Sequence, residues 1–345
     1  MWRTVLAVLA AVAVSAAPYE FEFPRDHGAH DDFATEWWYT TGHLTTADNH
    51  RYGFEVTFFR VRVGQTLLSA RPDKNVRPAS NWDLRNLALA HFAITDVDGK
   101  QFRYYEKLNR ASKFTANAAT GYLDVFNEGW RMTTTRDGSW RLIAADGKDA
   151  IDLTLRSRKP PAIHSEHRLS NYYSLTRLEA SGTIDGRRAR GAAWFDHEFG
   201  STALRQTQRG WDWYSVQLDN ETELMLYVIR RRDGSADTTS SGSLITPDGN
   251  VIHIRHDQMR IEPVARWRSP KSGATYPMGW RLTVPQFRIA LTLTPLLQQQ
   301  ELVTRESAQV TYWEGAVGVS GSFANVAVSG EGYVEMTGYD RAFRR

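Results

Sequence analysis

Six Asp-Gly pairs divide this 345-residue chain, and they constrain its fold more than any other feature of the sequence. Asp-Gly readily adopts the positive φ angles of tight hairpin turns, so this frequency predicts many antiparallel hairpins. Most of the pairs stand between apolar or alternating segments, as expected if each turn joins two strands. The pairs begin at Asp98, Asp137, Asp146, Asp185, Asp233 and Asp248.

The segments between these turns alternate as strands do. In 87–94 alternate residues take opposite faces, and in 224–229 both faces are apolar, which predicts burial on both sides. In 54–63 the apolar parity switches at Phe58-Phe59, which predicts a β-bulge there. Helical periodicity is rare, and the best candidate for one short helix is 294–304.

Many strands joined by tight turns are typical of β-sandwiches and β-barrels. The chain is too long for one ordinary domain and is long enough for two. We therefore expect an all-β protein with two tandem domains, over residues 18–185 and 186–345.

Residues 1–17 have the layout of a secretory signal peptide. Arg3 precedes a short apolar run over 5–14, and Val14-Ser15-Ala16 fits a small-residue cleavage site, which predicts cutting after Ala16 or Ala17. A retained membrane anchor is the alternative, but the run is short for a bilayer span. A periplasmic or secreted protein is expected.

Composition excludes several classes of protein and site. The chain has no cysteine, which excludes disulfides, thiol catalysis, a lipoprotein anchor and cysteine-based metal sites. Its net charge of +3 is small and its arginines are scattered, so nucleic-acid binding is not expected. Its 12 tryptophans suit broad β surfaces or an apolar cavity.

Several aromatic and acidic motifs occur in an order that resembles a known family. They span about residues 21–339 and resemble the lipocalin-like family of carotenoid 1,2-hydratases and AttH-type proteins. The motifs are PRDHGAH (24–30), TEWWYTTGHL (35–44), NYYS (171–174), AWFDHEFG (193–200), GWDWYSVQL (210–218), YWEGAV (312–317) and GYVEMTGY (332–339).

This resemblance implies two lipocalin-like, calycin-type antiparallel β-barrels with ligand contacts near their junction, and it implies no cofactor. Some members of the family hydrate isolated alkenes, some shape polyketide products, and AttH-type proteins are named for association with ABC transporters. The predicted signal peptide favours this exported branch. Phe195 and Phe199 replace a more usual Met and Trp, which is expected to alter the pocket.

Asp196 and Glu198 are the first candidates for catalysis. On a strand they share a face with Trp194. A carboxyl group in an apolar cavity has a raised pKa and can act as a proton donor, which hydration of an alkene needs. The resulting cation would be stabilised by the faces of Trp194, Trp211 and Trp213. Alternatively, the two acids pair with Arg205 or Arg209 and fix the junction.

Glu36, which shares a strand face with Trp38, is the third catalytic candidate, although this segment can equally be the opening strand of a barrel. We expect Glu36, Asp196 and Glu198 to converge on one cavity with Trp38, Tyr172, Trp211 and Trp213. The full set of expected ligand contacts is Trp38, His91, Tyr172, Trp194, Trp211, Asp212 and Trp213; His91 can instead be a core histidine.

Metal binding is not expected from the sequence. His27, His30 and Asp31 lie close together in a loop and are the best set of ligands, but loop histidines are common and no His-Glu-x-x-His motif is present. The pairs His164/His167 and His253/His256 are equally weak.

Three functions remain open from the sequence. The first is an exported carrier of an apolar or amphipathic, lipid-like or isoprenoid-like molecule, associated with an ABC transporter. The second is an enzyme that hydrates or isomerises an isoprenoid-like or carotenoid-like alkene through Asp196 or Glu198. The third is an interaction scaffold. A carrier needs only an apolar pocket with a few orienting polar groups, whereas an enzyme also needs an acid directed at the ligand.

Overall fold

A computed structural model of the chain describes residues 19–63, 86–164, 170–202 and 204–341. These residues are nearly all β, as predicted, and the short helical elements are the 3-10 turns η1 (Arg25–His27), η2 (His256–Gln258) and η3 (Pro285–Phe287). The predicted signal segment, 1–17, lies outside them. No helix within the described ranges is long and apolar enough to cross a membrane.

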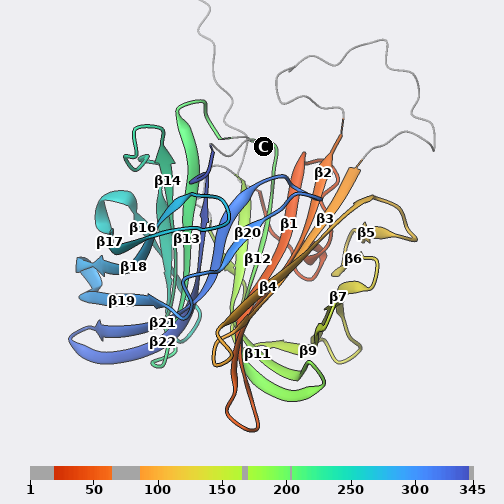
Figure 1. The fold of residues 1–345 in the computed structure, drawn as a ribbon, viewed down its shortest axis with the longest axis horizontal. Helices are drawn as coiled ribbons and strands as arrows, with labels where there is room; N and C mark the ends of the chain where they lie inside the picture. The colour runs from red at the N-terminus through yellow and green to blue at the C-terminus, as the bar shows by residue number, and fades with distance from the viewer. Residues whose placement is uncertain (1–18, 64–85, 165–169, 203, 342–345) are drawn as a thin grey trace, which may run out of the picture.

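Two antiparallel sheets lie side by side, the first from red to green and the second from green to blue (Figure 1). The first sheet has the strand order β4 (Gln101–Arg110), β3 (Asn86–Asp96), β2 (Arg51–Arg62), β1 (Thr35–Thr46), β12 (Arg187–Gly200), β11 (Asn171–Ile184), β9 (Asp149–Ser157), β8 (Trp140–Asp146), β7 (Trp130–Thr134), β6 (Asp124–Asn127), β5 (Ala116–Ala118), with β10 (Ala162–Ile163) paired to β11.

The second sheet is formed by the later part of the chain. Its order is β16 (Val251–Arg255), β15 (Ser241–Ile245), β14 (Glu223–Arg231), β13 (Gln208–Leu218), β22 (Val326–Thr337), β21 (Thr311–Phe323), β19 (Ile289–Pro295), β18 (Thr275–Val284), β17 (Arg260–Arg268), with β20 (Glu301–Val303) paired to β21.

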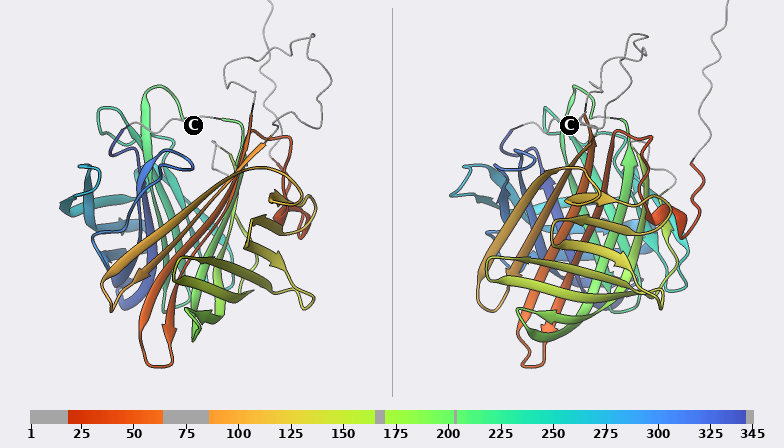
Figure 2. Two further views of the ribbon diagram at one scale, coloured as in Figure 1. Left: turned by 45° about the vertical axis from the view of Figure 1, so that its right-hand side comes forward. Right: turned by 90° about the vertical axis from the view of Figure 1, so that its right-hand side faces the viewer.

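The first sheet curls into a nearly closed barrel. In the right-hand view of Figure 2 its yellow and olive strands cross in front of the red ones. The two ends of the sheet meet where Asn127 of β6 donates a hydrogen bond to the carbonyl of Ala88 in β3, at 3.1 Å. The rings of Phe92 and Trp130 also make contact there, with centroids 5.7 Å apart. One apolar core therefore fills this barrel.

The second sheet forms a half-barrel around its own core. A third core lies between the sheets, where Tyr39, Tyr172 and Trp194 of the first pack with residues of the second that include Trp213 and Tyr333. Central strands therefore have one face in a barrel and the other against the neighbouring sheet. This explains why long runs in β1, β3 and β14 are buried on both faces.

The Asp-Gly pairs lie at turns between antiparallel strands, as predicted. The β11–β12 turn shows why the pair is suitable, since Asp185 has φ 49° and Gly186 has φ 73°. Two consecutive positive φ angles give the turn a twist that matches the strands it joins.

Two local predictions are wrong. Segment 294–304 is not helical, because the buried-exposed alternation of β19 continues to its end at Pro295 and β20 follows at Glu301. No bulge occurs at Phe58-Phe59, where the β1–β2 register runs without a shift. The parity switches there because both faces of β2 are buried, so apolar residues are tolerated on either one. Register shifts occur instead at 175–178 in β11 and at 208–210 in β13.

The change from one sheet to the next comes later than the boundary predicted at 185/186. That position falls in the β11–β12 turn, and β12 pairs with both β1 and β11 of the first sheet. The first sheet therefore extends to Gly200, and the second begins at Gln208. A tight Asp-Gly turn inside a sheet is locally indistinguishable from one that separates two domains.

Candidate functional site

A cavity of about 400 Å³ opens in the first barrel. Aromatic and aliphatic side chains and polar groups both form its wall. Asn86 contributes a buried side-chain oxygen that has no hydrogen-bond partner among the described residues. The lining residues are Asp31, Trp38, Phe58, Phe59, Arg60, Asn86, Ala88, Leu89, Ala111, Asn117, Ala118, Ala119, Thr120, Tyr122, Val125, Phe126 and Asn127.

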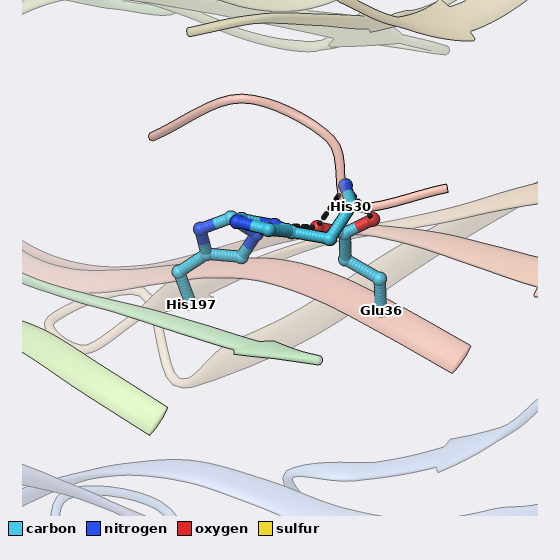
Figure 3. Close-up of side chains that lie close together, drawn as sticks. All are labelled: His30, Glu36 and His197. Carbon is cyan, nitrogen blue, oxygen red and sulfur yellow. Dashed lines mark hydrogen bonds and ion pairs between the residues drawn. The ribbon is translucent and has the colours of Figure 1, made fainter. Parts of the chain in front are cut away.

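A cluster of His30, Glu36 and His197 lies beside this cavity (Figure 3). His30 Nδ1 is 2.7 Å from Glu36 Oε1, and His197 Nε2 is 2.9 Å from the same oxygen. Trp38, which lines the cavity, stacks on the ring of His197 with centroids 4.8 Å apart. The three residues come from the loop before β1, from β1 and from β12.

Glu36 does not have the properties expected of a proton donor. Burial opposes its ionisation, but its close contacts with the rings of His197 and His30 and the charge of Arg60 lower its pKa to about 2. Arg60 Nε donates to Glu36 Oε2 at 3.0 Å. Glu36 is therefore a carboxylate at neutral pH, and the catalytic role expected for it is not supported.

Asp196 lies on the opposite face of β12, at the contact between the sheets. It accepts hydrogen bonds from Tyr172 Oη at 2.7 Å, Ser174 Oγ at 2.5 Å and Trp194 Nε1 at 2.6 Å. Trp213 Nε1 of the second sheet donates to Tyr172 Oη at 3.0 Å. Burial raises the pKa of Asp196 to about 7, although these hydrogen bonds oppose the shift. The alternative, a pairing of Asp196 with Arg205 or Arg209, is absent from its described contacts.

The seven residues expected to converge form separate groups. Tyr172, Asp196 and Trp213 meet at the contact between the sheets, whereas Glu36 and Trp38 lie on the barrel side. The β1–β12 register explains the split, because it places Trp38 opposite His197 and Tyr39 opposite Asp196.

The remaining candidates lie elsewhere. Glu198 accepts a hydrogen bond from Ser170 Oγ at 2.5 Å, and Trp211 Nε1 donates to Glu335 at 3.0 Å. Asp212 forms an ion pair with Arg230 at 2.9 Å. His91 bonds Tyr312 Oη at 2.6 Å across the two sheets, so it is a buried structural histidine. None of these four lines the cavity.

Sequence reasoning missed two features. His164, which the sequence indicates only as a weak metal ligand, connects the two sheets next to Asp196. Its Nε2 is 2.8 Å from Ser174 Oγ, which donates to Asp196, and its Nδ1 is 2.9 Å from Ser243 Oγ. Two buried carboxyl groups, Glu55 and Glu314, and the partly buried Glu335 also influence one another between the sheets. Glu314 and Glu335 face each other in the β21–β22 hairpin, whereas Glu55 lies in β2, far away in the sequence, so no local motif places all three together.

The histidine loop contributes differently from the expected His27, His30 and Asp31 set. Of these three, only His30 joins a group with metal-ligand spacing, together with Glu36 and His197. His27 instead lies with Nδ1 2.7 Å from Tyr173 Oη, and Asp31 lines the cavity.

Comparison with known proteins agrees with this architecture. An AttH-type protein from Nitrosomonas europaea has 32% identity and a TM-score of 0.81 over 94% of this chain and 99% of its own. Kievitone hydratase from Nectria haematococca has the same fold, with 16% identity and a TM-score of 0.68 over 93% of each chain. No match was found among curated protein sequences. The AttH-like family model matches residues 14–339. The chain therefore belongs to the AttH-like family.

Proposed function

We propose that this protein binds an amphipathic, lipid-like or isoprenoid-like small molecule in the cavity of the first barrel. The observation that carries the proposal is the cavity of about 400 Å³, whose wall combines aromatic side chains with a polar part that includes Asp31, Arg60 and Asn117. Small-molecule sites have this size, and an amphipathic ligand would place its hydrocarbon part on the aromatic side chains and its polar end on the polar groups.

The polar end of the ligand is expected to carry a hydrogen-bond donor. Asn86 Oδ1 is buried without a hydrogen-bond partner among the described residues, and a buried acceptor left unpaired costs about 1–3 kcal/mol. A ligand hydroxyl group would satisfy it after the amide turns toward the cavity. Phe58, Phe59 and Leu89 would then contact the hydrocarbon part. An isoprenoid alcohol fits this description better than the hydrocarbon alone.

Displacement of a fluorescent apolar probe by farnesol tests the proposal. Ala118 is half-buried on the edge strand β5 and lines the cavity, so Ala118→Trp fills it with little strain on the barrel. The affinity for farnesol should fall at least about tenfold, which is 1.4 kcal/mol. Ala145→Trp is the matched control, because Ala145 is exposed on β8 and does not line the cavity. Equal binding by the two variants would sink the proposal.

A hydratase is the second candidate. The observation that favours it is a buried carboxyl group, Asp196, that is bonded to Tyr172, Ser174 and Trp194 and to no cation among its described contacts. Asp196 does not line the described cavity, so the substrate would need another route to it. The assay is mass spectrometry for addition of water to an isoprenoid alkene by the wild-type protein and by Asp196→Asn. Absence of the hydrated product with the wild-type protein would eliminate this candidate.

We also propose that the protein is exported and that its partners include components of an ABC transporter. The support is the apolar run over 5–14 followed by Val14-Ser15-Ala16, together with the family's association with such transporters. N-terminal sequencing of the protein from its own cells should begin after Ala16 or Ala17. A mature protein that still begins at Met1 would contradict export by this route.

A further inference from the structure

Both ring nitrogens of His197 lie next to oxygen atoms. His197 Nδ1 is 3.0 Å from the carbonyl oxygen of Asp26, which can only accept, and 3.3 Å from Tyr173 Oη, so a proton on Nδ1 gives the shorter hydrogen bond. In this tautomer Nε2 has a lone pair, and the lone pair faces the Glu36 carboxylate at 2.9 Å. Two acceptors in contact repel each other, and a cation bound between them would remove this repulsion.

His30 has the same arrangement on the other side of Glu36. Its Nε2 lies 3.3 Å from Asp26 Oδ1, and its Nδ1 lies 2.7 Å from Glu36 Oε1. The Asp26 carboxylate is held in place by Arg25 Nε at 2.8 Å and by the backbone N–H of Glu22 at 2.6 Å. Each imidazole therefore lies between two acceptors, and each presents one nitrogen to the same oxygen of Glu36.

One divalent cation would satisfy this arrangement. The rings of His30 and His197, with centroids 5.4 Å apart, each present one nitrogen to Glu36, and His197 is fully buried. One ion bound to all three donors would place a positive charge against the carboxylate and remove the conflict of acceptors.

We propose that His30 Nδ1, Glu36 Oε1 and His197 Nε2 bind one divalent transition-metal ion, with zinc as the ion best suited to the donors. These atoms all lie within 4.8 Å of one another. Two histidines and one glutamate are a known donor set for zinc, which leaves a fourth position open. Ligand atoms around tetrahedral zinc are about 3.3 Å apart, so Glu36 Oε1 would move away from the rings by about half an ångström.

The surroundings match those of metal-binding histidines. The ring nitrogen that does not face the metal usually donates to a carboxylate or a backbone carbonyl, which fixes the tautomer. Asp26 supplies both acceptors, its carboxylate to His30 and its carbonyl to His197. Arg60 bonds the other oxygen of Glu36, Oε2, at 3.0 Å, and the backbone N–H of His30 donates to Oε1 at 3.0 Å, so Oε1 would keep this hydrogen bond while it binds the ion through another lone pair. The ion would connect the loop before β1 to β1 and β12, next to the wall of the ligand cavity.

Zinc titration of the full chain after treatment with a chelator tests this site. Isothermal titration calorimetry with zinc chloride should give one ion per chain. His30→Gln should weaken binding at least about 100-fold, which is 2.7 kcal/mol. His50→Gln is the matched control, because His50 also bonds a carboxylate, Asp96 at 2.6 Å, but lies outside the cluster. Asp26→Asn should weaken binding about 10–100-fold.

A second measurement does not depend on how well a variant folds. Cobalt(II) bound to the wild-type protein should give the visible absorption bands of a four-coordinate site with nitrogen and oxygen ligands. Nitrogen chemical shifts from NMR should show His30 Nδ1 and His197 Nε2 without protons when zinc is bound. The proposal is overturned if zinc binds the wild-type protein and His30→Gln equally, or if both rings stay doubly protonated at saturating zinc.

Discussion

Asp196 is held by hydrogen bonds alone in the described structure. Its carboxyl group is enclosed by Tyr172, Ser174 and Trp194, and Tyr172 in turn accepts from Trp213 of the other sheet. The group therefore links strands β11, β12 and β13 through neutral donors. Buried polar networks of this kind are stabilising only when every member is satisfied, so removal of one member affects the rest.

Replacement of Asp196 by alanine should lower the free energy of unfolding by about 3 kcal/mol. Three buried donors lose their acceptor, and each unpaired donor costs about 1–3 kcal/mol before the site relaxes. Asp152→Ala is the control, since the Asp152–Arg141 pair is largely exposed and should contribute less than about 1 kcal/mol. Urea unfolding followed by tryptophan fluorescence measures both variants. Equal stabilities would show that the Asp196 network does not hold the sheets together.

Strands β1 and β12 lie at the centre of the first sheet and also carry both candidate sites. Their register sets Glu36, Trp38 and His197 on the barrel side and Tyr39 and Asp196 on the side of the second sheet. Close backbone approach maintains this register at Gly191, where a Cβ atom would stand 1.9 Å from the carbonyl oxygen of His43. This position therefore needs glycine because space is lacking, and its φ angle is ordinary.

Gly191→Ala should destabilise the first sheet by at least about 3 kcal/mol, because a backbone atom, and not a flexible side chain, blocks the new methyl group. Gly129→Ala should change stability by no more than about 0.5 kcal/mol, since nothing lies within 4 Å of its Cβ position. Thermal unfolding monitored by circular dichroism compares the two. A Gly191→Ala protein as stable as Gly129→Ala would mean that β1 can shift freely against β12.

At the scale of the whole molecule, the contact between the sheets contains carboxyl groups that burial keeps protonated. Burial and the neighbouring Glu335 raise the pKa of Glu55 to about 8, although a hydrogen bond from Thr57 opposes the shift. Burial and the charges of Glu335 and Glu55 likewise raise the pKa of Glu314, which accepts from Tyr39 Oη at 2.7 Å. Tyr39, Tyr312 and Tyr333 also interact electrostatically with Glu55.

The contribution of Glu55 to the stability of the protein should therefore fall as the pH rises from about 4.5 to about 8. A carboxyl group whose pKa is raised in the folded state binds more protons there than in the unfolded chain. Its contribution is complete below the ordinary value of 4.5 and is lost as the pH rises through about 8. Glu55→Gln removes this titration, so the melting temperature of the variant should depend less on pH. Parallel curves for the two proteins would contradict a role for Glu55.

The sequence by itself determined the all-β architecture and much of the local chemistry. The Asp-Gly turns depend on nearest neighbours only, which is why Asp185-Gly186 predicted a hairpin correctly. The alternation of side chains along a strand is equally local. It places Glu36 and Tyr39 on opposite faces of β1, and Asp196 and His197 on opposite faces of β12.

Only the tertiary structure decided what each face meets. Curling of the first sheet placed Glu36 and His197 beside the cavity, and packing of the two sheets enclosed Asp196 with Trp213. Glu55 and Glu314 became neighbours by the same packing, although they lie in strands distant in sequence. The alternation of residues along a strand assigns each side chain to one face of the sheet. How the sheet curves, and what packs against each face, depends on contacts between strands that are distant in the sequence, and local sequence patterns do not specify those contacts.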